Sequence, residues 1–156
     1  MTTPPPDDVT GGAISPSRAD TERTLTVEAN KRLVVRAVTE VINRGDLDAV
    51  DDLFAPGIAT AARNWVTPFR QAFPDVRMDT VALVGEGDVV VGHFRCSGTQ
   101  TGPWMGRPAT GRSFRDVREV YWFTLRGGRI VDWWGLEDND ERRRQLRRPD
   151  VTGRPG

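Results

Sequence analysis

The chain has 156 residues, the size of one domain with a substantial core. Its 22 Lys and Arg residues balance 22 Asp and Glu residues, so net charge gives no reason to expect binding to nucleic acid or to an anionic membrane. The single cysteine, Cys96, excludes an intrachain disulfide, and neither a membrane-spanning run nor a signal pattern is present, which together predict a cytoplasmic protein.

The two ends of the chain differ in composition from its middle. Residues 1–24 are rich in Pro, Gly, Ser, Thr and Asp, and we expect a disordered leader there. The folded domain is predicted over residues 25–148. Residues 149–156 are predicted to form a flexible tail.

The first part of the domain has the periodicity of helices. Apolar spacing and capping residues predict three helices, over residues 27–43, 46–54 and 67–73. Residues 58–64 are predicted to be a short connection, because Thr67-Pro68 resembles the cap and first-turn proline of a new helix.

From Val76 onward the pattern changes to that of strands. Runs rich in β-branched and aromatic residues predict four strands, over residues 76–84, 89–97, 114–125 and 129–136. Because the helices precede the strands, the order predicts an α+β domain with helices on one side of a mainly antiparallel sheet. A strongly curved sheet would leave a cavity under the helices, which is the default small-molecule site.

The last predicted hairpin carries the candidate chemistry. Side chains alternate between the faces of a strand, so Glu119 and Tyr121 share a face with the apolar residues around them. Glu137 lies at the end of the return strand. Such carboxylates are either solvated strand ends or groups at the mouth of an apolar pocket, where a raised pKa would suit general acid or base catalysis. The pattern alone leaves both interpretations open.

Other kinds of site find little support. The chain has one histidine, His93, and no spacing typical of metal ligands, so no metal is predicted. Neither a dinucleotide-binding fingerprint nor a phosphate-binding loop is present, and no serine lies in a nucleophile elbow. If the protein is an enzyme, acid–base chemistry without a cofactor is the simplest remaining option.

Residues 28–147 resemble the SnoaL-like polyketide cyclase family of the NTF2-like superfamily. The most specific matches are Ala72-Phe73-Pro74-Asp75, the loop from Gly102 to Gly111, and Gly128-Arg129-Ile130 followed by Trp134, Asp138, Gln145 and Leu146. The resemblance implies an NTF2-like cone, in which three N-terminal helices pack on a strongly curved sheet around a hydrophobic pocket. It also implies tailoring of polyketides in antibiotic or other secondary metabolism, by ring closure or ring opening, without metal or cofactor. Relatives include cofactor-free hydroxylases, and homo-oligomers are common.

The sequence departs from this family at the site. The catalytic aspartate of the founding cyclases falls on Gly135, Tyr121 stands where they have a pocket histidine, and Gln100 replaces a loop histidine. Glu137 lies two residues beyond Gly135 on the same face, and the missing side chain at Gly135 is expected to leave space beside it. We therefore predict that Glu137 is the general acid or base, and that Glu119 and Tyr121 orient the substrate or stabilise an oxyanion.

The remaining site predictions concern substrate contacts and partners. The predicted substrate-binding residues are Trp65, Phe69, His93, Gln100, Trp104, Phe123 and Trp133. Asp138 points away from the pocket and is predicted to cap the C-terminal segment or to pair with one of Arg142 to Arg144. The five tryptophans could form a homodimer or higher oligomer through the exposed sheet face. A non-catalytic module that binds a small molecule is the alternative to an enzyme.

Overall fold

Helices come first along the chain and strands second, as the sequence predicts. The structure is a computed structural model that describes residues 14–147. The helices are α1 (Arg18–Arg36), the π-helix η1 (Ala37–Asn43), α2 (Ala49–Leu53), α3 (Pro56–Ala72) and α4 (Asn139–Arg147). The strands are β1 (Arg77–Glu86), β2 (Val89–Thr99), β3 (Ser113–Arg126) and β4 (Arg129–Glu137), and each end lies within two residues of its predicted position.

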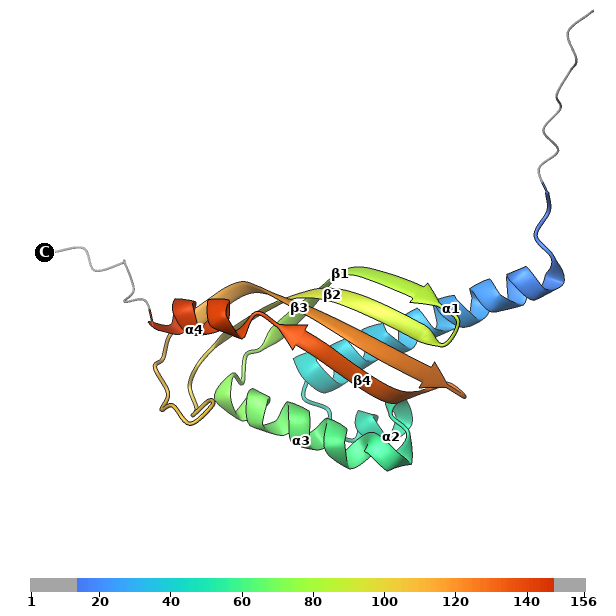
Figure 1. Cartoon of the computed structure of the whole chain (residues 1–156). Helices are drawn as coiled ribbons and strands as arrows, with labels where there is room; N and C mark the ends of the chain where they lie inside the picture. Colours follow the sequence, from blue (N-terminus) through green and yellow to red (C-terminus); the bar gives the residue numbers. More distant parts are fainter. Residues whose placement is uncertain (1–13, 148–156) are drawn as a thin grey trace, which may run out of the picture.

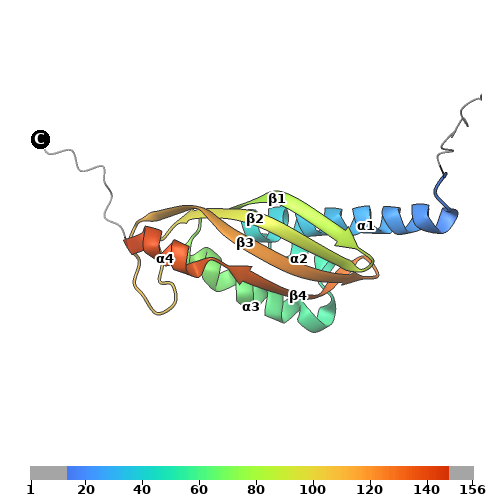
Figure 2. The same ribbon diagram turned by 45° about the horizontal axis from the view of Figure 1, so that its top comes forward.

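The four strands form one antiparallel sheet in the order β1-β2-β3-β4. The helices α1, α2 and α3 all lie on one side of this curved sheet (Figure 1), which confirms the predicted α+β architecture. The short helix α4 follows β4 and lies at the far end of the sheet, next to the loop that joins β2 to β3. No helix of the described residues covers the other face, which Figure 2 turns toward the viewer.

The helix α1 begins nine residues earlier than predicted, inside the expected disordered leader. Ser17 caps it, because its hydroxyl accepts from the N–H of Asp20 while the Asp20 carboxylate accepts from the N–H of Ser17. The first turns are exposed and carry an i,i+4 ion pair between Arg18 and Glu22. The sequence of these turns therefore lacks the apolar periodicity from which a helix is predicted. Residues 1–13 and 148–156, which include the rest of the leader and the tail, lie outside the described residues.

The helix α3 is longer than predicted, because the stretch 58–64 is helical and not a connection. Pro56 occupies the first turn, where its missing N–H costs no hydrogen bond. Pro68 lies inside the helix and removes one internal hydrogen bond without ending it. Trp65 and Phe69 are one turn apart on the continuous helix, so both reach the same cavity.

The inner face of the sheet forms the core together with the helices. On β3 every second residue from Val117 to Leu125 is buried, as the alternation predicts. Simple alternation along β4 puts Ile130 on the face opposite Glu137, but the pairing of β3 with β4 shifts between Thr124 and Leu125 and turns Ile130 into the core. The register places Glu137 directly opposite Glu119.

Candidate functional site

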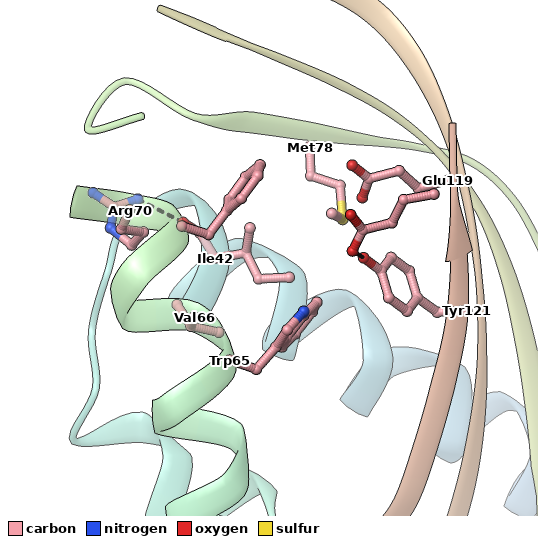
Figure 3. Close-up of a pocket in the computed structure, with 9 residues that line it drawn as sticks. Ile42, Trp65, Val66, Arg70, Met78, Glu119 and Tyr121 are labelled. Atoms are coloured by element: carbon pink, nitrogen blue, oxygen red, sulfur yellow. Dashed lines mark hydrogen bonds between the residues drawn. The ribbon is translucent and has the colours of Figure 1, made fainter. Parts of the chain in front are cut away.

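A pocket lies between α3 and the inner face of the sheet (Figure 3). Its apolar walls come from α3, η1 and β1, and consist of Ile42, Trp65, Val66, Phe69 and Met78. The strands β3 and β4 add Glu119, Tyr121 and Glu137 on the opposite side. The cavity itself measures about 20 Å³, which is room for a water molecule and far below the roughly 300–1,000 Å³ of a small-molecule site, so a substrate requires the walls to move apart.

A second apolar cavity lies next to this pocket. The two share Ile42, Trp65, Met78 and Tyr121 as walls. Phe123, a predicted substrate contact, lines only the second cavity.

The three predicted catalytic residues, Glu119, Tyr121 and Glu137, lie close together in the structure. Tyr121 is two residues beyond Glu119 on β3, so both side chains point inward (Figure 3). The Tyr121 hydroxyl donates to Oε1 of Glu137 at 2.5 Å. The three residues that strand parity groups on one face therefore lie within one small polar cluster of the pocket wall.

Arg142, a residue that sequence reasoning missed, joins the two carboxylates. Its side chain is fully buried and comes from α4. Nη2 donates to Oε1 of Glu119, and Nη1 donates to Oε2 of Glu137 at 3.2 Å and to the side-chain oxygen of Asn139. The sequence indicates only a run of charges, but the buried side of α4 repeats at Arg142 and Leu146, four residues apart.

Aromatic rings enclose the Arg142 guanidinium. The rings of Phe69, Trp104 and Phe114 have centroids 5.1, 5.6 and 4.8 Å from its central carbon. Cation–π attraction of this kind favours a desolvated guanidinium. Trp104 therefore contacts the site from behind Arg142 and is not part of the wall of the pocket that holds the carboxylates.

Contacts with β3 and its preceding loop hold α4 in place. Asp138 caps the helix, since its Oδ1 accepts from the N–H of Glu141 at 3.0 Å, as the sequence predicts. The Gln145 side chain makes two hydrogen bonds to the backbone of Arg115, at 2.8 and 3.1 Å. Arg112 donates to the last carbonyl groups of the helix. These contacts fix the helix whose buried side supplies Arg142.

Burial changes the proton affinities of the cluster. It raises the pKa of Glu119 to about 7, against the opposing charge of Arg142 and with some support from the charge of Glu137. Burial also raises the pKa of the Tyr121 phenol, which stays neutral. Although burial alone would lower the pKa of Arg142, the neighbouring Glu119 raises it overall. The guanidinium is therefore a permanent charge, whereas Glu119 titrates near neutral pH.

The space expected beside Gly135 is filled. A Cβ atom at this position would lie 2.2 Å from Cδ1 of Tyr121, because the aromatic ring packs directly on the glycine backbone. Gly135 therefore makes room for the Tyr121 ring and not for a ligand next to Glu137. This close approach places the phenol hydroxyl at the Glu137 carboxylate.

Two predicted substrate contacts, His93 and Gln100, lie away from the pocket. His93 is on the outer face of the sheet, because the inward positions of β2 are its neighbours Gly92 and Phe94. Gln100 is buried but braces the loop after β2, where it bonds to the carbonyl of Pro108 and the hydroxyl of Thr110. The period of the strand excludes His93, whereas the loop geometry that sequesters Gln100 has no sequence signal.

The other aromatic predictions divide between pocket and core. Trp65 and Phe69 line the pocket. Trp133 packs against Phe54 and Trp65 in the core, with ring centroids at 5.6 and 5.9 Å, and does not line the pocket. Trp133 therefore supports the wall from behind.

The described region has neither a metal-binding cluster nor a membrane-spanning helix. Among residues 14–147, no three His, Cys, Asp or Glu side chains are grouped so that they could hold a metal ion. No helix in this part of the chain is long and apolar enough to cross a membrane.

Solved structures share this architecture. A proposed SnoaL-like polyketide cyclase from Jannaschia sp. CCS1 superimposes with a TM-score of 0.72 at 24% identity, covering 78% of this chain and 94% of that one. Wild-type IdmH, a proposed polyketide cyclase from Streptomyces antibioticus, gives 0.66 at 26% identity, covering 75% and 97%. AclR, a proposed hydroxylase from Streptomyces galilaeus, gives 0.69 at 21% identity, covering 77% and 96%.

These likenesses confirm the predicted NTF2-like fold. No curated protein matches the chain in sequence. A sequence profile of the SnoaL-like polyketide cyclases matches residues 32–146, which is most of the chain and includes the whole carboxylate cluster and Arg142. The chain therefore belongs to the SnoaL-like polyketide cyclase family.

Proposed function

We propose that the protein is a cofactor-independent tailoring enzyme of polyketide or related natural-product biosynthesis, such as that of an antibiotic. Family membership and the cyclase and hydroxylase neighbours support a polyketide tailoring role in general. The observation that carries the proposal is the cluster of Glu119, Tyr121 and Glu137 around Arg142 at one side of an apolar pocket. The apolar walls suit a hydrophobic substrate, and the carboxyl groups suit proton transfer.

The reaction class is acid–base chemistry that closes or opens a ring. A carboxylate in a low-dielectric pocket can take a proton from carbon next to a carbonyl, and a carboxylic acid can return one to oxygen. The neutral phenol and the fixed guanidinium provide positive electrostatic potential for an enolate or oxyanion. General acid–base catalysis of this kind contributes roughly 10²–10⁴-fold to a rate.

Two alternatives have specific support. Similarity to AclR favours a cofactor-free hydroxylase of an aromatic polyketide. The small volume of the pocket, and the engagement of both Glu137 oxygens by protein donors, favour a non-catalytic module that binds a small molecule.

A panel of aromatic polyketides, incubated with the protein and analysed by mass spectrometry, tests these candidates. Ring closure by aldol addition leaves the mass unchanged, ring opening by water adds one water, and hydroxylation adds one oxygen. We expect the carboxyl substitutions Glu119→Gln and Glu137→Gln to slow turnover by roughly 10²–10⁴-fold. The exposed control Glu86→Gln should leave it unchanged. Binding without any conversion by the wild type would instead favour the binding module.

We also propose a homodimer formed through the outer face of the sheet. One apolar row crosses all four strands there, from Val84 and Val91 to Trp122 and Trp134. The indole rings of Trp122 and Trp134 stack with their centroids 5.3 Å apart, and the two residues are 40% and 52% exposed. Exposed apolar side chains grouped in this way are typical of an interaction surface. If a second copy covers this row, light scattering should give twice the monomer mass, and Trp134→Ser should halve it. A monomeric wild type would contradict the proposal.

A further inference from the structure

The two carboxyl groups of the pocket differ in how many donors they meet. Both oxygens of Glu137 are engaged, Oε1 by the Tyr121 hydroxyl and Oε2 by Arg142. Glu119 has one oxygen on Arg142, whereas its buried Oε2 meets no N–H or O–H donor within residues 14–147, and the Cys96 thiol is the one weak donor beside this carboxyl. A buried acceptor that receives no hydrogen bond lowers the stability of the folded state. Protonation of this oxygen, or a hydrogen bond with a ligand, would remove that cost.

The charges of the cluster do not balance if both carboxyl groups are ionised. One guanidinium faces two carboxylates, and like charges at such short range cannot both remain ionised at low cost. The Glu137 side chain is 23% exposed and accepts two hydrogen bonds. The Glu119 side chain is 1% exposed, and its one N–H donor is Arg142, which it shares with Glu137. Water and donors therefore keep the charge on Glu137, and the proton belongs on Glu119.

Building on the acid–base role above, we propose that Glu119 exchanges the proton with the bound molecule through its free oxygen Oε2, while Glu137 stays ionised. Glu119 is thus the catalytic residue of the pair. Glu137, Tyr121 and Arg142 act as positioning residues. This assignment reverses the roles that the sequence suggests for the two glutamates.

The position of Oε2 defines what it can do. Figure 3 shows the Glu119 carboxyl pointing from β3 into the pocket, beside Met78. Because Oε1 accepts from Arg142, the acidic proton resides on Oε2, and a hydrophobic ligand that displaces the wall around this buried atom accepts the proton on a carbonyl or ether oxygen. When the proton moves to that oxygen, Glu119 becomes a carboxylate that the guanidinium stabilises. The reverse transfer takes a proton from the ligand and restores the acid.

The surrounding groups agree with this assignment. The titratable groups that face Glu119 are Cys96 from β2, Tyr121 from β3, Glu137 from β4 and Arg142 from α4. The thiol and the phenol are neutral, because burial raises the pKa of each. Arg70 also lines the pocket, but its guanidinium is engaged by backbone carbonyl groups. Burial raises the pKa of Glu119 to about 7, so both forms are populated at neutral pH.

The test is a pH titration of the full chain, labelled with ¹³C at the glutamate carboxyl carbon and followed by NMR. We expect one glutamate signal to titrate near pH 7. The near-neutral signal should vanish in Glu119→Gln. It should persist in Glu137→Gln with a lower midpoint, because the neighbouring negative charge is gone. The exposed control Glu86→Gln should reproduce the wild-type curve for this signal.

Three results would overturn the assignment. The first is a wild type with no glutamate titrating between about pH 6 and 8. The second is a near-neutral signal that disappears in Glu137→Gln, which decides the matter even if Glu119→Gln does not fold. The third is a substrate that Glu119→Gln converts at the wild-type rate. A protein that converts no substrate but shows the expected titrations would contradict the proposed enzymatic function and leave the protonation of Glu119 as stated.

Discussion

Replacing Arg142 by methionine is expected to destabilise the protein by about 3–5 kcal/mol. The substitution removes hydrogen bonds to Glu119 and Glu137, each worth about 1.5–3 kcal/mol when a charge is involved. It also removes three contacts with aromatic rings, worth about 0.5–1 kcal/mol each. Part of this loss is offset, because methionine needs no desolvation of a guanidinium. The remainder is a large fraction of the 5–15 kcal/mol or so that stabilises a domain.

Urea denaturation at pH 7, followed by circular dichroism, measures this loss. Thermal unfolding should show a decrease in Tm of roughly 10–15 °C. Adding Glu119→Gln to Arg142→Met should recover about 1–3 kcal/mol, because the buried carboxyl that lost its cation is then gone. The matched control is Arg144→Met, which removes an exposed ion pair on the same helix and should cost less than about 1 kcal/mol. A cost below about 1 kcal/mol for Arg142→Met, or no recovery in the double variant, would refute the reasoning.

Three other substitutions test separate contacts. Because the pKa of Glu119 is raised to about 7, the folded state binds more protons than the unfolded state between about pH 4.5 and 7; stability should therefore fall as pH rises through this window. Urea titrations should show that the free energy of unfolding of the wild type, measured relative to that of Glu119→Gln, decreases by about 3 kcal/mol between these two pH values. Parallel curves of stability against pH for the two proteins would contradict this expectation. Gly135→Ala should cost about 1–3 kcal/mol in the same assay, less in a Tyr121→Leu background, whereas Gly57→Ala, with open space, should be neutral. Tyr121→Phe should cost about 1–2 kcal/mol, and an unchanged urea midpoint would show that its hydrogen bond to Glu137 contributes nothing.

Strand periodicity accounts for what the sequence predicts correctly at the site. Glu119, Tyr121 and Glu137 share one face because side chains alternate, and the register of β3 with β4 then places the two glutamates opposite each other. The same rule places His93 on the outer face, and its prediction as a substrate contact ignored that rule. The helical spacing of Trp65 and Phe69 likewise predicts their common side.

The features that escaped prediction depend on contacts between distant segments. Arg142 lies in a highly charged helix, and only its packing against β3 distinguishes it from Arg143 and Arg144, which form exposed or half-exposed pairs. The contact between Tyr121 and Gly135 arises from pairing across two strands, so neither residue signals it alone. The first turns of α1 are stabilised by a cap and by ion pairs, which leave no apolar stripe.

The position of Arg142 in α4 has a consequence for any shortened form of the protein. The sheet and the helices beneath it are complete at Glu137, before any residue of α4 has been added. A chain cut after Glu137 keeps Glu119 and Glu137 opposite each other without their cation, so closing the pocket requires a second proton beside the one on Glu119. Arg142 takes the place of that second proton, and Glu119 keeps its own. The final helix thus sets how much negative charge the pocket holds at neutral pH, although both carboxyl groups come from the sheet.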